Sequence, residues 1–472
     1  MIEERIIIVQ LARFGDLIQT SPLIRNLKYE PGFDREITLL VDNRTSPVAN
    51  MLYGVDNVVG INLDEIADIV STPGVSQYKR IKEWVAAWKP SQSYDRLILL
   101  NHGILTATIA SLVPARIREG PLLGEPLPRP HLYLTSTIND RHFNPLHLSE
   151  IWAAYGPLIL PLPTPKLKSC NMGTALAIST AKGSVVSLKT KGFAVNVGSG
   201  GHERNWSAAK LAVLIDQLIE GRAERVTLLG TENDCSTAEK VISAVAMDKR
   251  AGIINLCGIT RIEDLPVILE NCEVLISSDT GTLQLAAATS IQTVGLFFGG
   301  ANPHETGVFK PGAVALMDSN SLGSGQNNSD NISPESVAKI ALDLAFNDKN
   351  LKGNYDSSTF TTLVARSASV APEYRSLEAS KSDNMAWERR RTFARKILWG
   401  EKILQYKRKI EQELNGPHKS ELVREYSFMN TIENTHTLFN EGIDCPVDSA
   451  EGIWYQQLIK GLRNQLLQEA EI

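Results

Sequence analysis

Two successive series of strand-like and helix-like segments fill the first 345 residues, and this repeated alternation restricts the fold more than any other feature of the sequence. The first series has apolar runs at 5–11, 36–41 and 96–100 and amphipathic stretches at 16–28 and 103–112. The second series has apolar runs at 193–197, 225–229, 273–277 and 293–297. Its helical stretches begin at Ser207, lie near 235–246 and at 281–288, and include one that follows a capping box at Thr260 and Glu263. Such alternation predicts parallel sheets that are covered by helices.

A proline-rich segment separates the two series. Nine prolines lie between Pro121 and Pro165, a density that interrupts regular structure and suits a domain edge followed by a linker. We therefore predict an α/β protein with two Rossmann-like domains that face a cleft, over residues 1–165 and 185–345. An irregular linker is expected over 346–384.

Residues 385–472 are predicted to form a helical, basic appendage. Between Glu388 and Ile410 there are nine basic and two acidic residues, interleaved with apolar side chains. One interpretation is a helix that packs across the domains or against a second subunit, with its charges in solvent. The other is peripheral contact with an anionic membrane surface.

Length and charge exclude several classes of protein. A chain of 472 residues is too long for one ordinary core. The net charge of -5 argues against a general nucleic-acid binder. Glu3 and Glu4 precede only a short apolar run, unlike a signal peptide, and no apolar stretch approaches the ~20 residues that span a bilayer. Five scattered cysteines suit reduced thiols, so we expect a cytoplasmic protein.

The first candidate site is the segment LARFGDLIQTSP, where a buried strand meets a helix. Gly15 permits a tight turn there, and Asp16 lies at the mouth of the helix, on the edge of the sheet that faces a ligand. The alternative is that Asp16 is only the N-cap residue of the helix.

Two further strand-to-helix junctions occur in the second series. In NVGSGGHERNW, backbone amides of residues 198–201 could hold phosphate oxygens and Arg204 could add a bidentate charge. The alternative is a structural turn, because Glu203 stands where the third glycine of GxGxxG belongs. In SSDTGTLQLAAA, Asp279 and Thr280 lie at a helix entrance, where either could also be a simple cap.

Together these segments resemble glycosyltransferase family 9, the heptosyltransferases, over about residues 5–310. The residues that match the family's motifs are Gly15, Asp16, Thr20 and Pro22; Arg204 and Trp206; Gly230 and Glu232; Asn255, Leu256 and Gly258; Asp279, Thr280, Gly281, Ala286 and Ala287; and the FFGGANP segment ending at Pro303. The resemblance implies a GT-B fold and inverting transfer from a nucleotide-diphospho-sugar, typically ADP-heptose, to a cell-envelope glycan or lipid-linked acceptor. It implies no cofactor beyond this donor substrate.

The resemblance also implies roles for individual residues. Asp16 would be the general base that takes the proton of the acceptor hydroxyl. Glu232 would bind the ribose, and Asp279 a sugar hydroxyl or neighbouring amides. The remaining donor-binding residues implied by the resemblance are Ser199, Gly200, Arg204, Thr280, Gly281 and Gln284, and those expected on the acceptor side are Arg13, Asn101 and His102. For Asn101 and His102, capping of the next turn is an equally good interpretation.

Two positions depart from the family pattern. Gln284 stands where the family usually has His, so a contact to the donor could weaken or serve another donor. Arg204 replaces the more usual Lys, which keeps the charge and changes its geometry. No D-x-D motif is present, which disfavours a metal-dependent transferase. Two alternatives to the transferase are an epimerase of the same architecture and an inactive sugar-nucleotide-binding scaffold.

Overall fold

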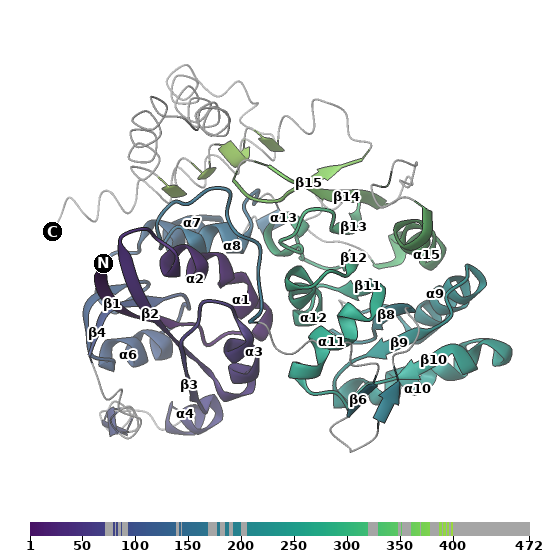
Figure 1. Ribbon diagram of the computed structural model, residues 1–472, viewed down its shortest axis with the longest axis horizontal. Coiled ribbons are helices and arrows are strands. Elements are labelled where there is room, and N and C mark those ends of the chain that lie inside the picture. Colours follow the sequence, from purple (N-terminus) through teal and green to yellow (C-terminus); the bar gives the residue numbers. More distant parts are fainter. Residues whose placement is uncertain are drawn as a thin grey trace. The chain divides into compact units, whose positions relative to one another are not determined.

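The computed structural model forms two compact α/β units, shown in Figure 1. It describes residues 1–70, 93–137, 144–168, 192–199, 205–319, 329–347, 360–368 and 370–377. It also describes strands 177–179 and 185–187, residues 141–142 and 351, and single residues within 79–86 and 387–399. The first unit comprises Met1–Asn139, Leu148–Pro163 and the chain from Thr392, and the second comprises Asp140–His147 and Thr164–Arg391. The predicted α/β class is therefore confirmed.

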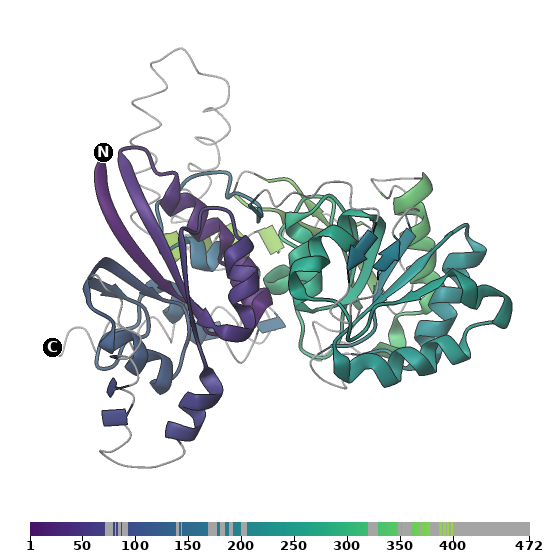
Figure 2. The same cartoon turned by 60° about the horizontal axis from the view of Figure 1, so that its bottom comes forward.

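The first unit is built on a five-stranded parallel sheet of order β3-β2-β1-β4-β5. Its strands are β1 (Ile2–Val9), β2 (Phe33–Asp42), β3 (Asn57–Ile61), β4 (Tyr94–Leu99) and β5 (Ala115–Glu119). Its helices include α1 (Phe14–Gln19), α2 (Ser21–Lys28), α3 (Ser46–Met51), α4 (Leu63–Val70), α6 (Ile104–Leu112), α7 (Arg129–Thr137) and α8 (Leu148–Ala153). Figure 2 shows β1 and β2 side by side in purple. Residues Ile6 to Val9 of β1 are fully buried, as expected for a strand that is covered on both faces.

The second unit has an eight-stranded sheet of order β10-β9-β8-β11-β12-β13-β14-β15. Its strands are β8 (Gly192–Asn196), β9 (Val226–Leu229), β10 (Ile253–Asn255), β11 (Cys272–Ser278), β12 (Gln292–Phe297), β13 (Val314–Asp318), β14 (Phe360–Arg366) and β15 (Glu373–Ser376). Its helices include α9 (Ala208–Glu220), α10 (Cys235–Ala244), α11 (Leu265–Glu270), α12 (Gly281–Leu285), α13 (Pro303–Thr306) and α15 (Pro334–Leu342). A separate pair, β6 (Ala177–Ser179) and β7 (Val185–Ser187), is antiparallel.

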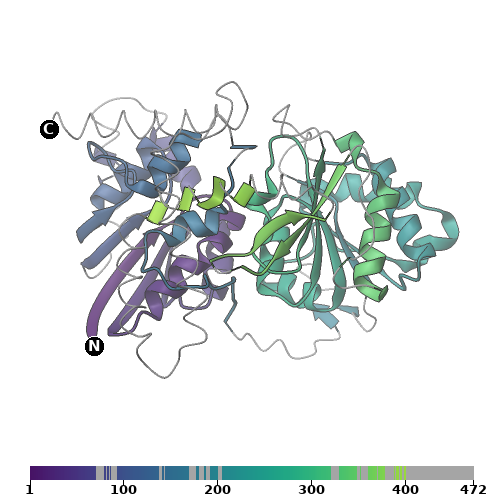
Figure 3. The same cartoon turned by 90° about the horizontal axis from the view of Figure 1, so that it is seen from above.

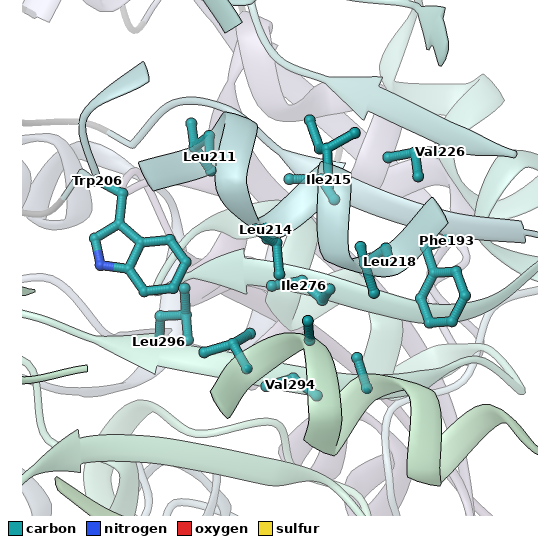
Figure 4. Close-up of a cluster of buried hydrophobic side chains, with 14 of the residues drawn as sticks. Phe193, Trp206, Leu211, Leu214, Ile215, Leu218, Val226, Ile276, Val294 and Leu296 are labelled. Carbon is teal, nitrogen blue, oxygen red and sulfur yellow. The ribbon is translucent and has the colours of Figure 1, made fainter. Parts of the chain in front are cut away.

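Helix α9 shows how the sequence pattern builds the second core. The Ser207 side chain accepts a hydrogen bond from the Lys210 N–H and so caps the helix start. The predicted apolar face then packs on the sheet, where Leu214, Ile215 and Leu218 contact residues such as Ile276 and Val294 (Figure 4). Each of these fully buried aliphatic side chains stabilises the fold by about 1.5–3 kcal/mol relative to exposure.

Three local predictions differ from the structure. The single helix expected over 16–28 is divided at Thr20, because Pro22 lacks the N–H that a continuous helix needs and instead lies in the first turn of α2, where no such N–H is required. The capping box before α11 is one residue later than expected, since the Asp264 carboxylate accepts the Arg261 N–H at 3.0 Å. Residues 360–376, placed in an irregular linker, contain β14, which pairs antiparallel with β13, and β15, which pairs antiparallel with β14 (Figure 3).

The described part of the basic C-terminal segment is helical, and three of its arginines are buried although Glu388 is exposed. Arg391 forms an ion pair with Glu373 at 3.1 Å within the second unit. In the first unit, the Arg395 guanidinium binds both oxygens of the buried Glu150 carboxylate, at 2.6 and 2.9 Å. The expectation that this helix keeps its charges in solvent is therefore wrong for Arg390, Arg391 and Arg395, all less than 9% exposed.

Candidate functional site

The loops after β1 and β4 are joined at the carboxyl edge of the first sheet. Because the two strands are parallel neighbours, their loops leave the sheet side by side. The Asn101 Oδ1 accepts the Leu11 N–H at 2.5 Å, and its Nδ2 donates to the Gln10 Oε1 at 2.6 Å. Asn101 thus crosslinks the loops, and the interpretation that it caps the next turn is wrong, because Gly103 is the N-cap residue of α6.

Asp16 lies in the first turn of α1, directly beyond this crosslink. The N-cap residue is Arg13, which has extended backbone and makes no side-chain capping bond, so the interpretation of Asp16 as the cap is wrong. The Asp16 side chain is half-buried, and the Thr20 hydroxyl donates to the Asp16 backbone carbonyl at 3.0 Å. Arg13 is exposed beside it. A carboxylate at this edge of a parallel sheet is placed to accept a proton from a bound ligand.

His102 packs on a buried aromatic group behind the same edge. Its ring meets that of His131 edge-on, with centroids 4.4 Å apart, and partial burial lowers the pKa of His102. Burial, with a smaller contribution from His102, lowers the pKa of His131 to about 3. Neutral His131 donates from Nε2 to the Leu100 carbonyl at 3.3 Å, which leaves Nδ1 to accept the Tyr155 hydroxyl. The tautomer of His131 is thereby defined, and only His102 of this pair is exposed.

In the second unit, the loops after β8, β9 and β10 lie in close contact. A Cβ added to Gly198 would stand 1.9 Å from the Asp234 Oδ1, so the glycine allows this approach. Asp234 itself accepts hydrogen bonds at 2.7 Å from the Thr231 N–H and the Thr231 hydroxyl. Gly258 has φ +70° and packs against Glu232. The Glu232 Cα lies 3.1 Å from the position that a Cβ on Gly258 would take. These contacts leave Glu232 exposed at the start of the turn, with Ser199 half-buried in the β8 loop.

The loop after β11 carries Asp279, Thr280 and Gly281. The Thr280 side chain caps α12 by accepting the Leu283 N–H and also bonds the Ser277 hydroxyl at 2.9 Å. Because β8 and β11 are parallel neighbours, this loop and the Ser199 loop emerge at the same edge of the second sheet. Thr280 is thus the N-cap residue of α12, which is one of the two roles that the sequence left open for it.

Gln284 has a bonding partner within the protein. Its side chain is 3% exposed, and its Nε2 donates to the Thr306 carbonyl at 2.5 Å. The Thr306 hydroxyl in turn donates to the Asp279 Oδ2 at 3.0 Å. These two bonds connect α12, α13 and the end of β11.

Two predicted donor-binding residues, Gly200 and Arg204, lie outside the described residues. Among the residues that are described, no group of three or more histidine, cysteine, aspartate or glutamate side chains is arranged to hold a metal ion. None of the described helices is both long and apolar enough to cross a membrane.

Comparison with known proteins decides the family. The model of glycosyltransferase family 9 (heptosyltransferase) matches residues 90–331, slightly more than half of the chain. The chain belongs to glycosyltransferase family 9. The residues at the edge of the second sheet lie inside the matched range, whereas Arg13 and Asp16 precede it.

Individual proteins that this chain resembles are distant from it in sequence. Lipopolysaccharide heptosyltransferase 3 of Escherichia coli is 24% identical over 300 residues, covering 61% of this chain and 80% of that protein. Lipopolysaccharide heptosyltransferase 2 of Salmonella typhimurium is 27% identical over 97 residues. That match covers 21% of this chain and only 28% of the relative's own length.

Solved structures agree on the fold. A family 9 glycosyltransferase from Veillonella parvula superimposes with a TM-score of 0.54 at 18% identity, covering 72% of this chain and 97% of that one. The E. coli ADP-heptose lps heptosyltransferase II gives a TM-score of 0.53 at 19% identity, covering 72% and 98%. The predicted GT-B type fold with two Rossmann-like domains is confirmed.

Some residues at these family 9 sheet edges were not anticipated from the sequence. Gln10, Asp234 and Thr306 each make hydrogen bonds that organise a loop beside a predicted site residue. The T-x-x-D spacing of Thr231 and Asp234 is a capping signature that could have identified Asp234. Gln10 and Thr306 bond residues far away in sequence, and no local pattern identifies such partners.

Proposed function

We propose that this protein is an inverting glycosyltransferase that moves a heptose or a similar sugar from ADP-heptose, or a related nucleotide-diphospho-sugar, to a cell-envelope glycan such as lipopolysaccharide core. The observation that carries the proposal is that a chain of glycosyltransferase family 9 has Ser199, Glu232 and Thr280 on loops that leave one edge of the second sheet. The lipopolysaccharide heptosyltransferases among its relatives support the choice of sugar and acceptor.

On the donor side, polar groups would hold the nucleotide diphosphate. The proposed diphosphate contacts are Ser199, Gly200, Arg204, Thr280 and Gly281. Glu232 is exposed, and among the described residues no group donates a hydrogen bond to its carboxylate, which is therefore available to the ribose hydroxyls. Asp279 would bind a sugar hydroxyl. Fixed donors around the diphosphate would stabilise the negative charge that develops as it leaves.

On the acceptor side, Asp16 would be the general base. The acceptor hydroxyl oxygen forms a bond to the anomeric carbon while its proton passes to the Asp16 carboxylate. The bond from the anomeric carbon to the diphosphate oxygen breaks, and the nucleotide diphosphate leaves with that electron pair. Arg13 and His102 would contact the acceptor, and the Asn101 crosslink would hold the β1 loop that leads to Asp16.

A donor screen followed by a transfer assay tests the proposed function. Nucleotide sugars that bind the folded protein raise its melting temperature with concentration, and ADP-heptose is expected to do so. The bound donor should then be consumed only when a glycan acceptor is added. Interconversion of the sugar without any acceptor would instead identify an epimerase, and binding without either reaction would identify an inactive scaffold.

Transfer is expected to continue in EDTA. The sequence has no D-x-D motif, and we propose that backbone amides and Arg204 supply the charge that a metal supplies in other transferases. The measurement is the initial rate with EDTA, compared with the rate after Mg²⁺ or Mn²⁺ is added back. A strict requirement for either ion would contradict this part of the proposal.

Glu232→Gln is expected to raise the donor KM by about tenfold or more, because hydrogen bonds to a charged group are worth about 1.5–3 kcal/mol. The change keeps the side-chain shape at an exposed position, so the melting temperature without ligand should not move. Glu239→Gln, on the exposed face of α10, is the matched control and should leave the KM unchanged. An unchanged KM in Glu232→Gln would remove this residue from the ribose site.

We propose a cytoplasmic location, with contact to the inner face of the membrane through the basic C-terminal segment. Arg390, Arg391 and Arg395 are buried, so any charge for the lipid surface would come from the other six basic residues between Glu388 and Ile410. Replacing Lys407, Arg408 and Lys409 with glutamine should abolish low-salt co-sedimentation with anionic vesicles. Equal sedimentation of both proteins would contradict the membrane contact.

A further inference from the structure

The turn at Asn302–Gly307, which contains α13, is held firmly within the second unit. The Asn302 Nδ2 donates to the backbone carbonyls of Arg141 and Asn144 at 2.8 and 3.0 Å. The Glu305 carboxylate is 2% exposed and accepts from the Arg141 Nε at 2.9 Å and the Asn144 Nδ2 at 3.2 Å. A buried carboxylate with charged and neutral donors on it is costly to displace. Thr306, the next residue, therefore has little freedom to move.

Thr306 directs its hydroxyl at Asp279. The hydroxyl oxygen lies 3.0 Å from the Asp279 Oδ2 and 3.3 Å from the Asn302 carbonyl oxygen. A threonine hydroxyl has one proton to donate. The shorter, charge-assisted bond to the carboxylate is the stronger of the two. Thr306 thus restrains the orientation of the Asp279 carboxylate before any donor binds.

Gln284 holds Thr306 from the other side. Its Nε2 donates to the Thr306 carbonyl at 2.5 Å, and its side chain is buried on α12. The amide N–H is available at every pH, whereas a neutral histidine offers one ring N–H that depends on its tautomer. Glutamine at this position therefore supplies a permanent donor to the Thr306 carbonyl.

We propose that Thr306 is a positioning residue that orients the Asp279 carboxylate for the donor sugar, and that Gln284 acts by holding Thr306 rather than by touching the donor. This inference rests on the proposed transferase function. Orienting the carboxylate in advance lowers the entropy lost when the donor binds, because the side chain no longer has to be ordered at that moment.

The test compares Thr306→Val, which keeps the shape and removes the hydroxyl, with Thr306→Ser, which keeps the hydroxyl. Thr306→Val is expected to lower kcat/KM for the donor about tenfold, mainly through KM, whereas Thr306→Ser should stay within about twofold. Equal kcat/KM for Thr306→Val and the unchanged protein would overturn the inference.

Gln284→Met removes the amide donor at similar volume and separates the two roles of Gln284. If it acts through Thr306, the double variant with Thr306→Val should lose no more than about twofold beyond the larger single loss. If Gln284 contacts the donor directly, the two losses should multiply, and the second half of the inference would be wrong.

Hydrogen exchange without any ligand tests the positioning role independently of activity. Thr306→Val should speed amide exchange over residues 279–284, and Thr306→Ser should not. Unchanged exchange in Thr306→Val would overturn the inference even if no sugar donor is found. Faster exchange in a protein that transfers no sugar would leave the restraint on Asp279 standing and reject the transferase.

Discussion

Asp16→Asn is expected to lower kcat by about 10²-fold or more while donor binding stays normal, because the amide keeps the shape of the carboxylate and cannot accept the acceptor proton. Asp16 is half-buried in the first turn of α1 and is not the helix cap, so its loss should not unfold α1. The measurement is kcat at saturating donor and acceptor, together with donor binding by calorimetry.

The matched control for Asp16 is Asp34→Asn, the same chemical change at an exposed position near the start of β2 in the same unit. It should have the activity of the unchanged protein. If Asp16→Asn also kept a near-normal rate on a good acceptor, the general base would have to be another residue. A loss of donor binding in Asp16→Asn would instead place this residue at the donor.

Breaking the ion pair between Arg395 and Glu150 is expected to have the largest effect on stability. Both side chains are at most 5% exposed, and the contact is bidentate. Arg395→Met leaves the Glu150 carboxylate without its guanidinium partner in the interior, which should reduce the free energy of unfolding by about 3–5 kcal/mol. The measurement is the urea midpoint of the full chain.

Two controls separate the ion pair from general damage. The double change Arg395→Met with Glu150→Leu should recover most of the lost stability, because no unpaired charge remains buried. Glu83→Gln breaks the exposed pair between Lys79 and Glu83 and should leave the midpoint unchanged. If Arg395→Met did not lower the urea midpoint, this result would show that residues near 395 do not pack in the first unit in solution.

The sequence predicts the sheets well because buried parallel strands and amphipathic helices leave local patterns. The apolar face of α9 and the runs at β1, β8, β11 and β12 are examples. The prediction from the sequence failed where a single residue interrupts a helical pattern, as Pro22 does between α1 and α2. The polar stretch that contains β14 and β15 was also missed, since β14 extends the sheet by pairing with β13 and β15 then pairs with β14.

For the candidate site, the sequence by itself determined which residues stand at the strand ends, because the carboxyl edge of a parallel sheet follows from the order of strands and helices along the chain. Asp16 and Asp279 were identified in this way, whereas Glu232 was implied by the resemblance to glycosyltransferase family 9. Only the tertiary structure decided how the side chains are bonded. Asn101 reaches Leu11 across 90 residues, Gln284 reaches Thr306, and Arg395 reaches Glu150 across 245 residues. The physical reason is that burial makes each polar group find a partner, and that partner is set by the packing of distant segments rather than by sequence neighbours.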